Sequence, residues 1–333
     1  MARVVHPGGV SRRRFLRQSI AASVIGAAGL PRVFREWAEA VEPKAPARSK
    51  VVEATNPAWK RDGKVDPEAV RRTLERGLME FTGKPSVADA WRQFASPSET
   101  IGVKFNDISQ NFSGANQALG DAIIDGLLQA GLQREKIILV EAVGASFPGT
   151  GQADRTLGPE FDTGHGKTRH TRFLREQIDG IINVPDLKEH DRAGVTLAVK
   201  NLSHGRSFIP NPGSFHSNYC DPHVGELHSQ KLILTKRRLN ILNGLRGIFH
   251  LGPSPGAARW QWDRNSLFFS TDPVAMDAIG LDITQEKRRT APDGIQVVDL
   301  FQTNRRPVFL ATCVEMGLGI GDLKRIDWVR VQV

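Results

Sequence analysis

The sequence offers few residues for cross-links or metal clusters. Its 333 residues include two cysteines, Cys220 and Cys313, and no Cys-x-x-Cys pair. A four-thiolate iron–sulfur cluster is therefore not expected. The two thiols can form at most one disulfide, which an oxidising compartment would favour, and two free buried thiols are the simpler expectation.

Residues that bind nucleic acid are also scarce. The chain has a single tyrosine and 7% aromatic residues, and no block of Lys and Arg is interleaved with aromatics. The formal net charge of +9 is uneven, because residues 1–40 hold seven Arg and two Glu and leave only +4 for the rest. We therefore expect no nucleic-acid partner.

The N-terminal 40 residues have the features of an export signal. Residues 11–17 (SRRRFLR) resemble the twin-arginine motif, and the eleven apolar residues 20–30 that follow are too few to span a bilayer. Ala38 and Ala40 supply an Ala-x-Ala cleavage site. We expect a signal peptide over residues 1–40, the twin-arginine translocase as its partner, and a periplasmic protein. A basic amphipathic helix is the alternative.

The rest of the chain alternates strands and helices. Residues 41–65 are Pro-rich and polar and predict a linker. Asp66 followed by Pro67 predicts a helix start, and Gly83 its end. The hydrophobic pattern further predicts strands at 100–106, 136–142, 180–185, 239–245, 266–270 and 328–333. It predicts helices at 116–130, 171–177, 272–283 and 306–317. This pattern predicts one α/β domain over residues 66–333, with a doubly wound, mostly parallel sheet and helices on both faces.

The stretch PDLKEHDRAGVTLAVKNLSHG (residues 185–205) is the main candidate site. Lys188 and His190 follow a strand, and ligands of open α/β sheets bind beyond the carboxyl ends of strands. If the chain stays extended, both side chains share one face. Apolar residues at helical spacing then place Thr196 and Lys200 one turn apart, with Asn201 beside them, although strand spacing would also put Thr196 and Lys200 on one face.

The stretch VKFND (residues 103–107) predicts a second part of the same site. Lys104, Asn106 and Asp107 end a strand, and the loop behind them leads to a helix N-terminus, which favours an anion. That loop contains one glycine, Gly114, and matches neither a dinucleotide-binding fingerprint nor a phosphate-binding loop. A solvated lysine at a strand end is the simpler alternative.

Clustered cations would give this site its chemistry. Lys104, Lys188, Lys200 and Arg192 would hold a carboxylate or phosphate together, or lower the pKa of one lysine by repulsion. His190 is the natural proton carrier. The alternative is that His190 pairs locally with Asp191 and that the lysines line a wet rim.

Two other stretches contain candidate groups. FHSNYCDPHVGELH supplies His216, Cys220 and His223 as ligands for a divalent metal, with His228 and Asp221 nearby; the alternative is that these side chains are structural or solvated. In STDPVAMDAIG, Asp272 precedes Pro273 and predicts a helix N-cap. Asp277, in the next turn, would be a charge partner for the lysines.

Several motifs occur in the order seen in a known family. IGVKFN, IINVPDLKEHDRAGVTLAVKNLSHG, NYCDPHVGELH, LNILNGLRGIFHLGPSP, STDPVAMDAIG and MGLGIGD resemble the domain-of-unknown-function 362 family, from about residue 56 onward. Two residues depart from its pattern: Glu189 stands where the family has Thr, and Asn243 where a strand usually ends in Asp. Some members carry a cysteine-rich ferredoxin-like segment that this chain lacks, and the resemblance implies no activity.

We therefore expect an enzyme that acts on a small anionic molecule in a pocket of lysines and histidine. The residues expected to form it are, as catalytic groups, Lys188, His190 and Lys200, and, as substrate-binding groups, Lys104, Asn106, Thr196, Asn201, Asp272 and Asp277. The alternative is a non-catalytic protein that binds a solute or a metal, or an accessory factor for assembling another exported protein.

Overall fold

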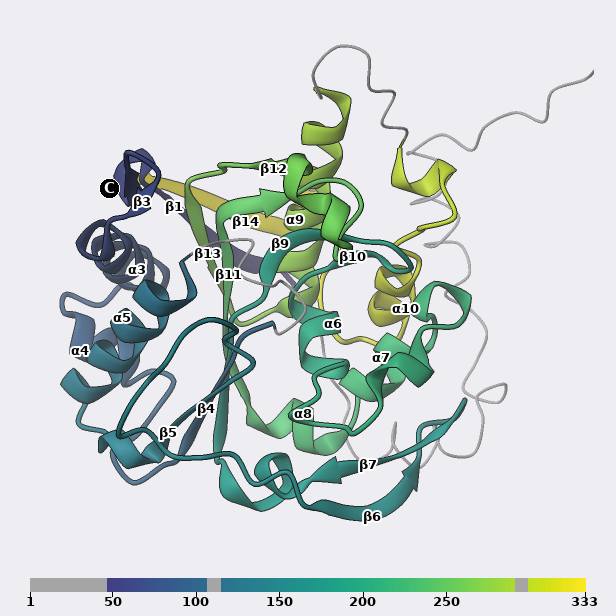
Figure 1. Cartoon of the computed structure of the whole chain (residues 1–333), viewed down its shortest axis with the longest axis horizontal. Helices are drawn as coiled ribbons and strands as arrows, with labels where there is room; N and C mark the ends of the chain where they lie inside the picture. Colours follow the sequence, from purple (N-terminus) through teal and green to yellow (C-terminus); the bar gives the residue numbers. More distant parts are fainter. Residues whose placement is uncertain (1–46, 107–114, 291–298) are drawn as a thin grey trace, which may run out of the picture. The chain divides into compact units, whose positions relative to one another are not determined.

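The computed structural model describes residues 47–106, 115–290 and 299–333 (Figure 1). All of them belong to one compact unit that spans Lys44–Val333. The export signal predicted for residues 1–40, and the predictions for Asp107 and Gly114, lie outside the described residues. Within the part of the chain that is described, no helix is long and apolar enough to cross a membrane.

A mixed sheet of mostly parallel strands forms the centre of the unit, as the sequence predicts. Its strands, in spatial order, are β14 (Ile326–Gln332), β1 (Ser49–Thr55), β13 (Ser266–Ser270), β11 (Arg237–Ile248), β8 (Gly180–Asn183), β4 (Ile101–Lys104) and β5 (Ile137–Val140). Neighbours along this order are parallel, except that β13 is antiparallel to both β1 and β11.

The long strand β11 carries the sheet beyond the end of β8. Its first half pairs with β8, and its second half pairs in parallel with β9 (Asp186–His190) and antiparallel with β12 (Gln261–Trp262). A short strand, β10 (Gly194–Thr196), then pairs antiparallel with β9. The chain therefore does not leave the sheet at Pro185, and Lys188 and His190 lie in a strand as the extended alternative predicts.

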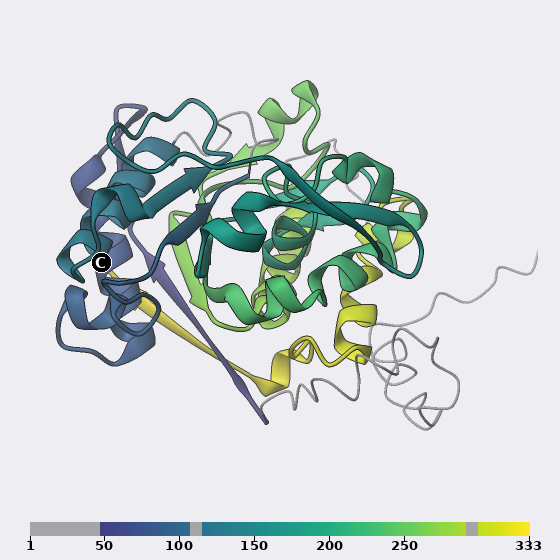
Figure 2. The same cartoon turned by 90° about the horizontal axis from the view of Figure 1, so that it is seen from below.

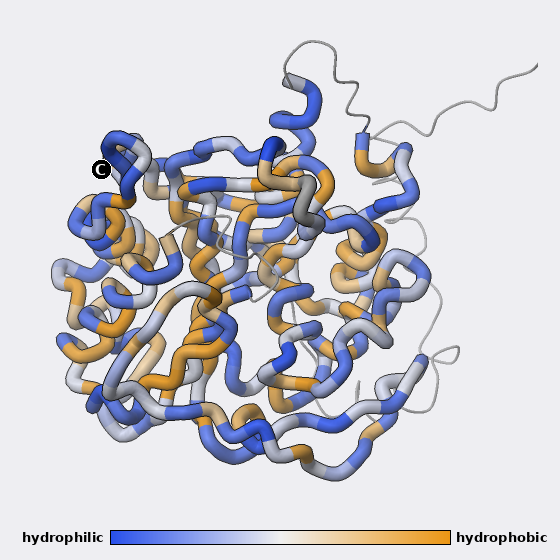
Figure 3. The backbone as a smooth tube through the Cα atoms, viewed as in Figure 1, coloured by the Kyte–Doolittle hydropathy of each residue, from blue (hydrophilic) through white to orange (hydrophobic). Residues whose placement is uncertain are grey.

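Helices cover both faces of the sheet (Figures 1 and 2). The helices on one face are α3 (Pro67–Thr82), α4 (Val87–Trp91) and α5 (Asn116–Gln129), and those on the other are α6 (Ala198–Ser203), α7 (His223–His228), α8 (Lys231–Lys236), α9 (Pro273–Arg289) and α10 (Phe309–Glu315). Hydrophobic residues gather along the strands and on the helix surfaces that cover them (Figure 3). Burial of these apolar stripes is the main force that holds the layers together.

The predicted helix ends are confirmed. The Asp66 carboxylate accepts the backbone N–H groups of Glu68 and Ala69 at the start of α3. Gly83 ends the same helix at φ +68°, a left-handed conformation that glycine adopts without steric cost. Asp272 likewise caps α9 through the N–H groups of Val274 and Ala275.

Three sequence predictions about local structure are wrong. Residues 49–55 are not linker but β1, a mostly buried strand with partners on both sides. Thr196 lies in β10 and not in a helix, because pairing with β9 overrides the helical spacing and α6 begins only at Ala198. Residues 143–170 are rich in Gly, Asp, Thr and His, which predicts a long irregular segment, but they contain a hairpin of β6 (Leu157–Asp162) and β7 (Lys167–Thr171).

Candidate functional site

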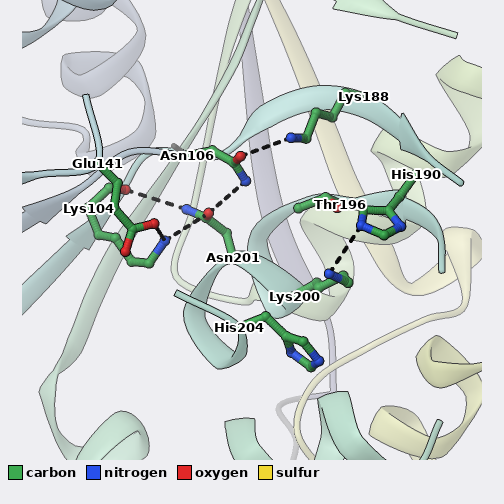
Figure 4. A pocket seen from close by; sticks show the side chains of 9 residues that line it. All are labelled: Lys104, Asn106, Glu141, Lys188, His190, Thr196, Lys200, Asn201 and His204. Atoms are coloured by element: carbon green, nitrogen blue, oxygen red, sulfur yellow. Dashed lines mark hydrogen bonds and ion pairs between the residues drawn. The ribbon is translucent and has the colours of Figure 1, made fainter. Parts of the chain in front are cut away.

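A small recess lies where β4, β5 and β9 end and α6 begins (Figure 4). Its volume is about 20 Å³, which is room for a water-sized group or a compact ion. The lining residues are Lys104, Asn106, Glu141, Lys188, His190, Thr196, Lys200, Asn201 and His204. Of the predicted site residues in residues 185–205 and in VKFND, Lys104, Asn106, Lys188, His190, Thr196, Lys200 and Asn201 therefore line one recess, whereas Arg192 does not.

Lys104 is held in an ion pair that the sequence reading did not anticipate. Its ammonium lies 3.0 Å from Glu141 Oε2, and both side chains are buried. It also donates to the carbonyl of Phe105 and to Asn201 Oδ1, each at 3.0 Å. An ammonium has three N–H donors, and these three contacts occupy them. Lys104 therefore supports the wall of the recess rather than clamping an anion.

Close packing around Lys104 explains a glycine in the loop after α6. A Cβ atom on Gly205 would lie 2.1 Å from Lys104 Cε and 2.9 Å from its Nζ. The other oxygen of Glu141, Oε1, accepts the backbone N–H of Ser207 in the same loop. The ion pair thus ties the ends of β4 and β5 to the segment that follows α6.

A row of amide side chains connects the recess to the sheet. Asn201 Oδ1 accepts from both Lys104 and Asn106, and Asn201 Nδ2 donates to Asn183 Oδ1 at 2.8 Å. Asn183 in turn donates to Asn240 Oδ1 in β11 at 2.9 Å. These buried amides satisfy one another, so the recess wall is a connected polar network with a defined geometry.

Lys188 and Thr196 face each other across β9 and β10. The register pairs Thr196 directly with Lys188, and His190 lies two residues along on the same side of β9. Lys188 Nζ donates to Asn106 Oδ1 at 2.8 Å. Thr196 Oγ1 is buried and has no hydrogen-bond partner within the described residues. A buried hydroxyl without a partner costs free energy, so this group marks a place where a polar ligand or water fits.

His190 is a buried, neutral imidazole in the wall of the recess. Burial, followed by the positive charges of Lys200 and Lys188, lowers its pKa well below the ordinary value. The backbone N–H groups of Arg192 and Ala193 point at Nδ1, at 3.1 and 3.2 Å. Asp191 Oδ1 also lies 3.1 Å from Nδ1, so the local contact with Asp191 that the sequence offered as an alternative is present. Nε2 lies 3.4 Å from the Lys200 ammonium, which can only donate, so Nε2 is an acceptor toward Lys200.

Two further histidines surround Lys200. His216 Nε2 accepts from the Lys200 ammonium at 3.0 Å, because its Nδ1–H is directed to the Gly213 carbonyl at 3.2 Å. The rings of His190 and His216 stack with centroids 5.3 Å apart. Burial and Lys200 lower the pKa of His216 to about 4 and that of His204 well below its usual value. All three imidazoles are therefore neutral near pH 7.

The described lining residues of the recess carry more positive than negative formal charge. They include three lysines and one glutamate, and Lys104 is paired with Glu141. The hydroxyl of Thr196 adds a neutral donor at the same place. This combination of cations and donors in a buried site suits an anionic oxygen.

Asp272 and Asp277 do not line the recess. Asp272 caps α9 and accepts from Ser49 Oγ and from the backbone N–H of Ile320. Asp277 accepts the backbone N–H groups of Ala198 and Val199 at the start of α6, at 2.6 and 3.1 Å. Burial raises the pKa of Asp277 well above its usual value. Its carboxyl group holds α6 in place below the recess, whereas the sequence reading expected it to face the lysines.

The proposed metal ligands are not brought together. No group of three or more His, Cys, Asp and Glu side chains among residues 47–106, 115–290 and 299–333 could hold a metal ion. His216 contacts Lys200, His223 contacts Ser217, and Cys220 is a buried free thiol. Burial raises the pKa of Cys220 to about 11. Cys313 is also buried and free, so the expectation of two free thiols is confirmed.

Two residues of the recess, Glu141 and His204, were missed in the sequence. Glu141 directly follows β5, so the strand-end rule that selected Lys104 could have found it. His204 lies one turn after Lys200 at the end of α6, a spacing that also predicts proximity. Arg192, which was grouped with the lysines, is exposed and does not line the recess.

A larger depression elsewhere has no such surplus of charge. It has a volume of about 200 Å³ and is lined by Asp154, Arg172, Glu176 and Gln177. Arg172 pairs with both Asp154 and Glu176 at its exposed surface. Exposed pairs of this kind are common on protein surfaces and contribute little.

Comparison with known proteins gives few matches. No curated protein sequence matches the chain. A crystal structure of a Thermotoga maritima protein, determined in a structural genomics programme, is similar at 9% identity, with a TM-score of 0.31, over 55% of this chain and 51% of that one. The chain thus spans about half the length of that protein.

A family model matches the centre of the chain. The matched residues, 159–282, extend from β6 into α9 and include Lys188, His190, Thr196 and Lys200, whereas Lys104 lies before them. The model is that of a domain of unknown function (DUF362). The match supports the resemblance of this chain to the DUF362 family over the segment that builds most of the recess.

Proposed function

We propose that the recess is the substrate site of an enzyme that acts on a small anionic molecule. The observation that carries the proposal is Thr196 Oγ1, a buried hydroxyl without a partner within the described residues, placed among Lys188, His190 and Lys200. An oxygen of a carboxylate or phosphate would accept from this hydroxyl and from the cations beside it.

Each group has a separate role in this proposal. Lys188 and Lys200 attract the anion and stabilise negative charge on it. His190, a buried neutral imidazole beside Lys200, is the proton carrier. Several histidines with a lowered pKa gather at one place, which is typical of catalytic sites.

Binding of simple anions tests the proposal. We expect inorganic phosphate or a small carboxylate to bind the wild-type protein in isothermal titration calorimetry. Thr196→Val should weaken that binding by about tenfold or more, since one hydrogen bond to a charged group contributes about 1.5–3 kcal/mol. Folding should be unaffected by this change because the hydroxyl makes no hydrogen bond within the described protein.

The controls use similar residues away from the recess. Thr235→Val and Lys231→Met alter exposed positions of α8 and should bind like wild type, whereas Lys188→Met should lose binding. If none of the anions binds wild-type protein, or if Thr196→Val and Lys188→Met bind as well as the controls, the recess is not an anion site.

A non-catalytic solute-binding protein is the second candidate. The volume of about 20 Å³ favours it, since a compact ion fits without leaving room for a second reactant. Mass spectrometry of the protein purified from its native source separates the two: an unchanged bound anion favours a binding protein, and conversion of added anion into product favours an enzyme.

We also propose that the chain is exported to the periplasm by the twin-arginine route. The proposal rests on the motif in residues 11–17 and on the apolar stretch behind it. Replacing Arg12 and Arg13 by lysine should keep the protein in the cytoplasm on cell fractionation. Export that continues unchanged would contradict the proposal, and replacing Arg32 and Arg35 is the matched control.

A further inference from the structure

A hydroxyl, an imidazole and a carboxylate lie in a row at the start of α7, outside the recess. Ser217 Oγ lies 2.9 Å from His223 Nε2, a hydrogen-bond distance. Three residues further on, Glu226 Oε2 lies 3.7 Å from His223 Nδ1 on the other side of the ring. Ser217 is exposed, whereas His223 and Glu226 are buried. An exposed serine is thus backed by two buried titratable side chains.

The buried carboxylate of Glu226 is held in position by a second histidine. His165, in the turn between β6 and β7, contacts Glu226 Oε1 through Nδ1 at 2.5 Å, and in Figure 1 the β6–β7 hairpin lies beside α7. Glu226 Oε2 and His223 Nδ1 are buried and have no hydrogen-bond partner within the described residues. At 3.7 Å apart, these two atoms would form a hydrogen bond after a small movement of the ring.

The backbone after Ser217 is strained. Asn218, Tyr219 and Cys220 have φ values of +45°, +60° and +63°, three consecutive non-glycine residues in the left-handed region. Such conformations cost free energy and concentrate at functional sites. Here the turn leaves Ser217 exposed while its hydroxyl stays against His223.

We infer that Ser217 is a nucleophile for acyl transfer from an ester. Oγ attacks the ester carbonyl carbon while its proton passes to His223 Nε2, and the C–O bond to the alcohol breaks as His223 returns that proton to the leaving oxygen. Water, deprotonated by His223, then attacks the acyl-serine and releases the carboxylic acid and the serine hydroxyl. Glu226 is a positioning residue that orients the imidazole and stabilises its cationic form.

This site is distinct from the anion recess. His216 and Ser217 are adjacent in sequence, but His216 contacts Lys200 whereas Ser217 contacts His223. The ring of Phe215 lies between the two sites, with centroids 6.4 Å from His204 and 5.5 Å from His223. Changes at Ser217 should therefore leave anion binding intact.

A fluorophosphonate probe tests the nucleophile directly. We expect the purified full chain to be labelled once, with the label on the peptide that contains Ser217 by mass spectrometry. Ser217→Ala should abolish labelling, and its folding is not in question because the side chain is exposed. Ser214→Ala is the matched control, because Ser214 is an exposed serine of the same loop, and it should be labelled at the wild-type rate.

The rate of labelling by the fluorophosphonate tests the roles of the two buried residues, His223 and Glu226. His223→Gln should slow labelling by about 100-fold or more, the usual contribution of a general base. Glu226→Gln should also slow it, and Glu226→Asp, which keeps the carboxylate, should recover part of the rate. Hydrolysis of p-nitrophenyl acetate should follow the same order, with an acetyl group trapped on Ser217. No label on wild-type protein, equal labelling of Ser217→Ala, or an unchanged rate in folded His223→Gln would overturn the inference.

Discussion

Replacing Glu141 by glutamine is expected to destabilise the folded protein by about 3–5 kcal/mol, as found when one partner of a buried ion pair is removed. Lys104 and Glu141 are 1% and 3% exposed, with 3.0 Å between charged atoms. The glutamine amide would point its N–H groups at either Lys104 or the Ser207 N–H, and both of these are donors. Urea unfolding followed by circular dichroism measures the loss.

A double-mutant cycle shows whether the pair is the cause. Lys104→Met alone should be similarly destabilising, and the double variant should lose less than the sum of the single losses because the second change removes a partner already lost. Glu80→Gln is the control, since Glu80 pairs with Arg76 at the exposed surface of α3 and should cost about 0–1 kcal/mol. A loss for Glu141→Gln as small as that of the control, or strict additivity, would show that the pair does not hold the recess together.

Acidification from pH 7 to pH 4 is expected to lower stability by several kcal/mol. Burial is the largest of the effects that lower the pKa of six histidines. They are His170, His190, His204, His216, His228 and His250. In the unfolded chain these groups titrate near 6.5. Between that pH and about 4 the unfolded state therefore binds more protons, so the free energy of unfolding falls as the pH falls.

Two buried carboxyls oppose this trend. Burial raises the pKa of Glu189 and of Asp277, so each stabilises the fold when protonated and loses that contribution as the pH rises. The histidines outnumber them, and below about pH 6.5 each binds a proton more readily in the unfolded chain, so the net effect is destabilisation by acid.

His170→Phe tests the histidine contribution. His170 is buried against the ring of Phe161, with centroids 4.3 Å apart, and its pKa falls to about 4. The difference from 6.5 corresponds to about 3 kcal/mol at pH 4. Phenylalanine cannot be protonated, so the variant should lose about that much less stability between pH 7 and pH 4 in urea unfolding. Thr168→Val, a buried change on the same strand, is the control and should leave the loss of stability between pH 7 and pH 4 unaltered. If His170→Phe also leaves that loss unaltered, His170 is already charged at pH 7 and the prediction is wrong.

The sequence alone predicted the α/β class and most of the recess, because both depend on local patterns. Strand and helix alternation is visible in hydrophobic spacing, and helix starts at Asp66 and Asp272 follow from short-range capping. Lys104 and Lys188 were found because polar residues after strands mark the carboxyl edge of a sheet. Residues 49–55 were missed because a short strand between Pro-rich flanks has the composition of a linker.

The tertiary structure alone decided what these residues do. Lys104 is not free to bind an anion, because Glu141 and Asn201 both contact its ammonium. These partners lie 37 and 97 residues away in sequence, so local patterns could not reveal them. His216, which the sequence offered as a metal ligand, instead accepts from the Lys200 ammonium. The same holds for Ser217, His223 and Glu226, whose alignment depends on a strained turn. Sequence spacing indicates which groups share a neighbourhood, whereas contacts between distant segments set their charge, proton positions and partners.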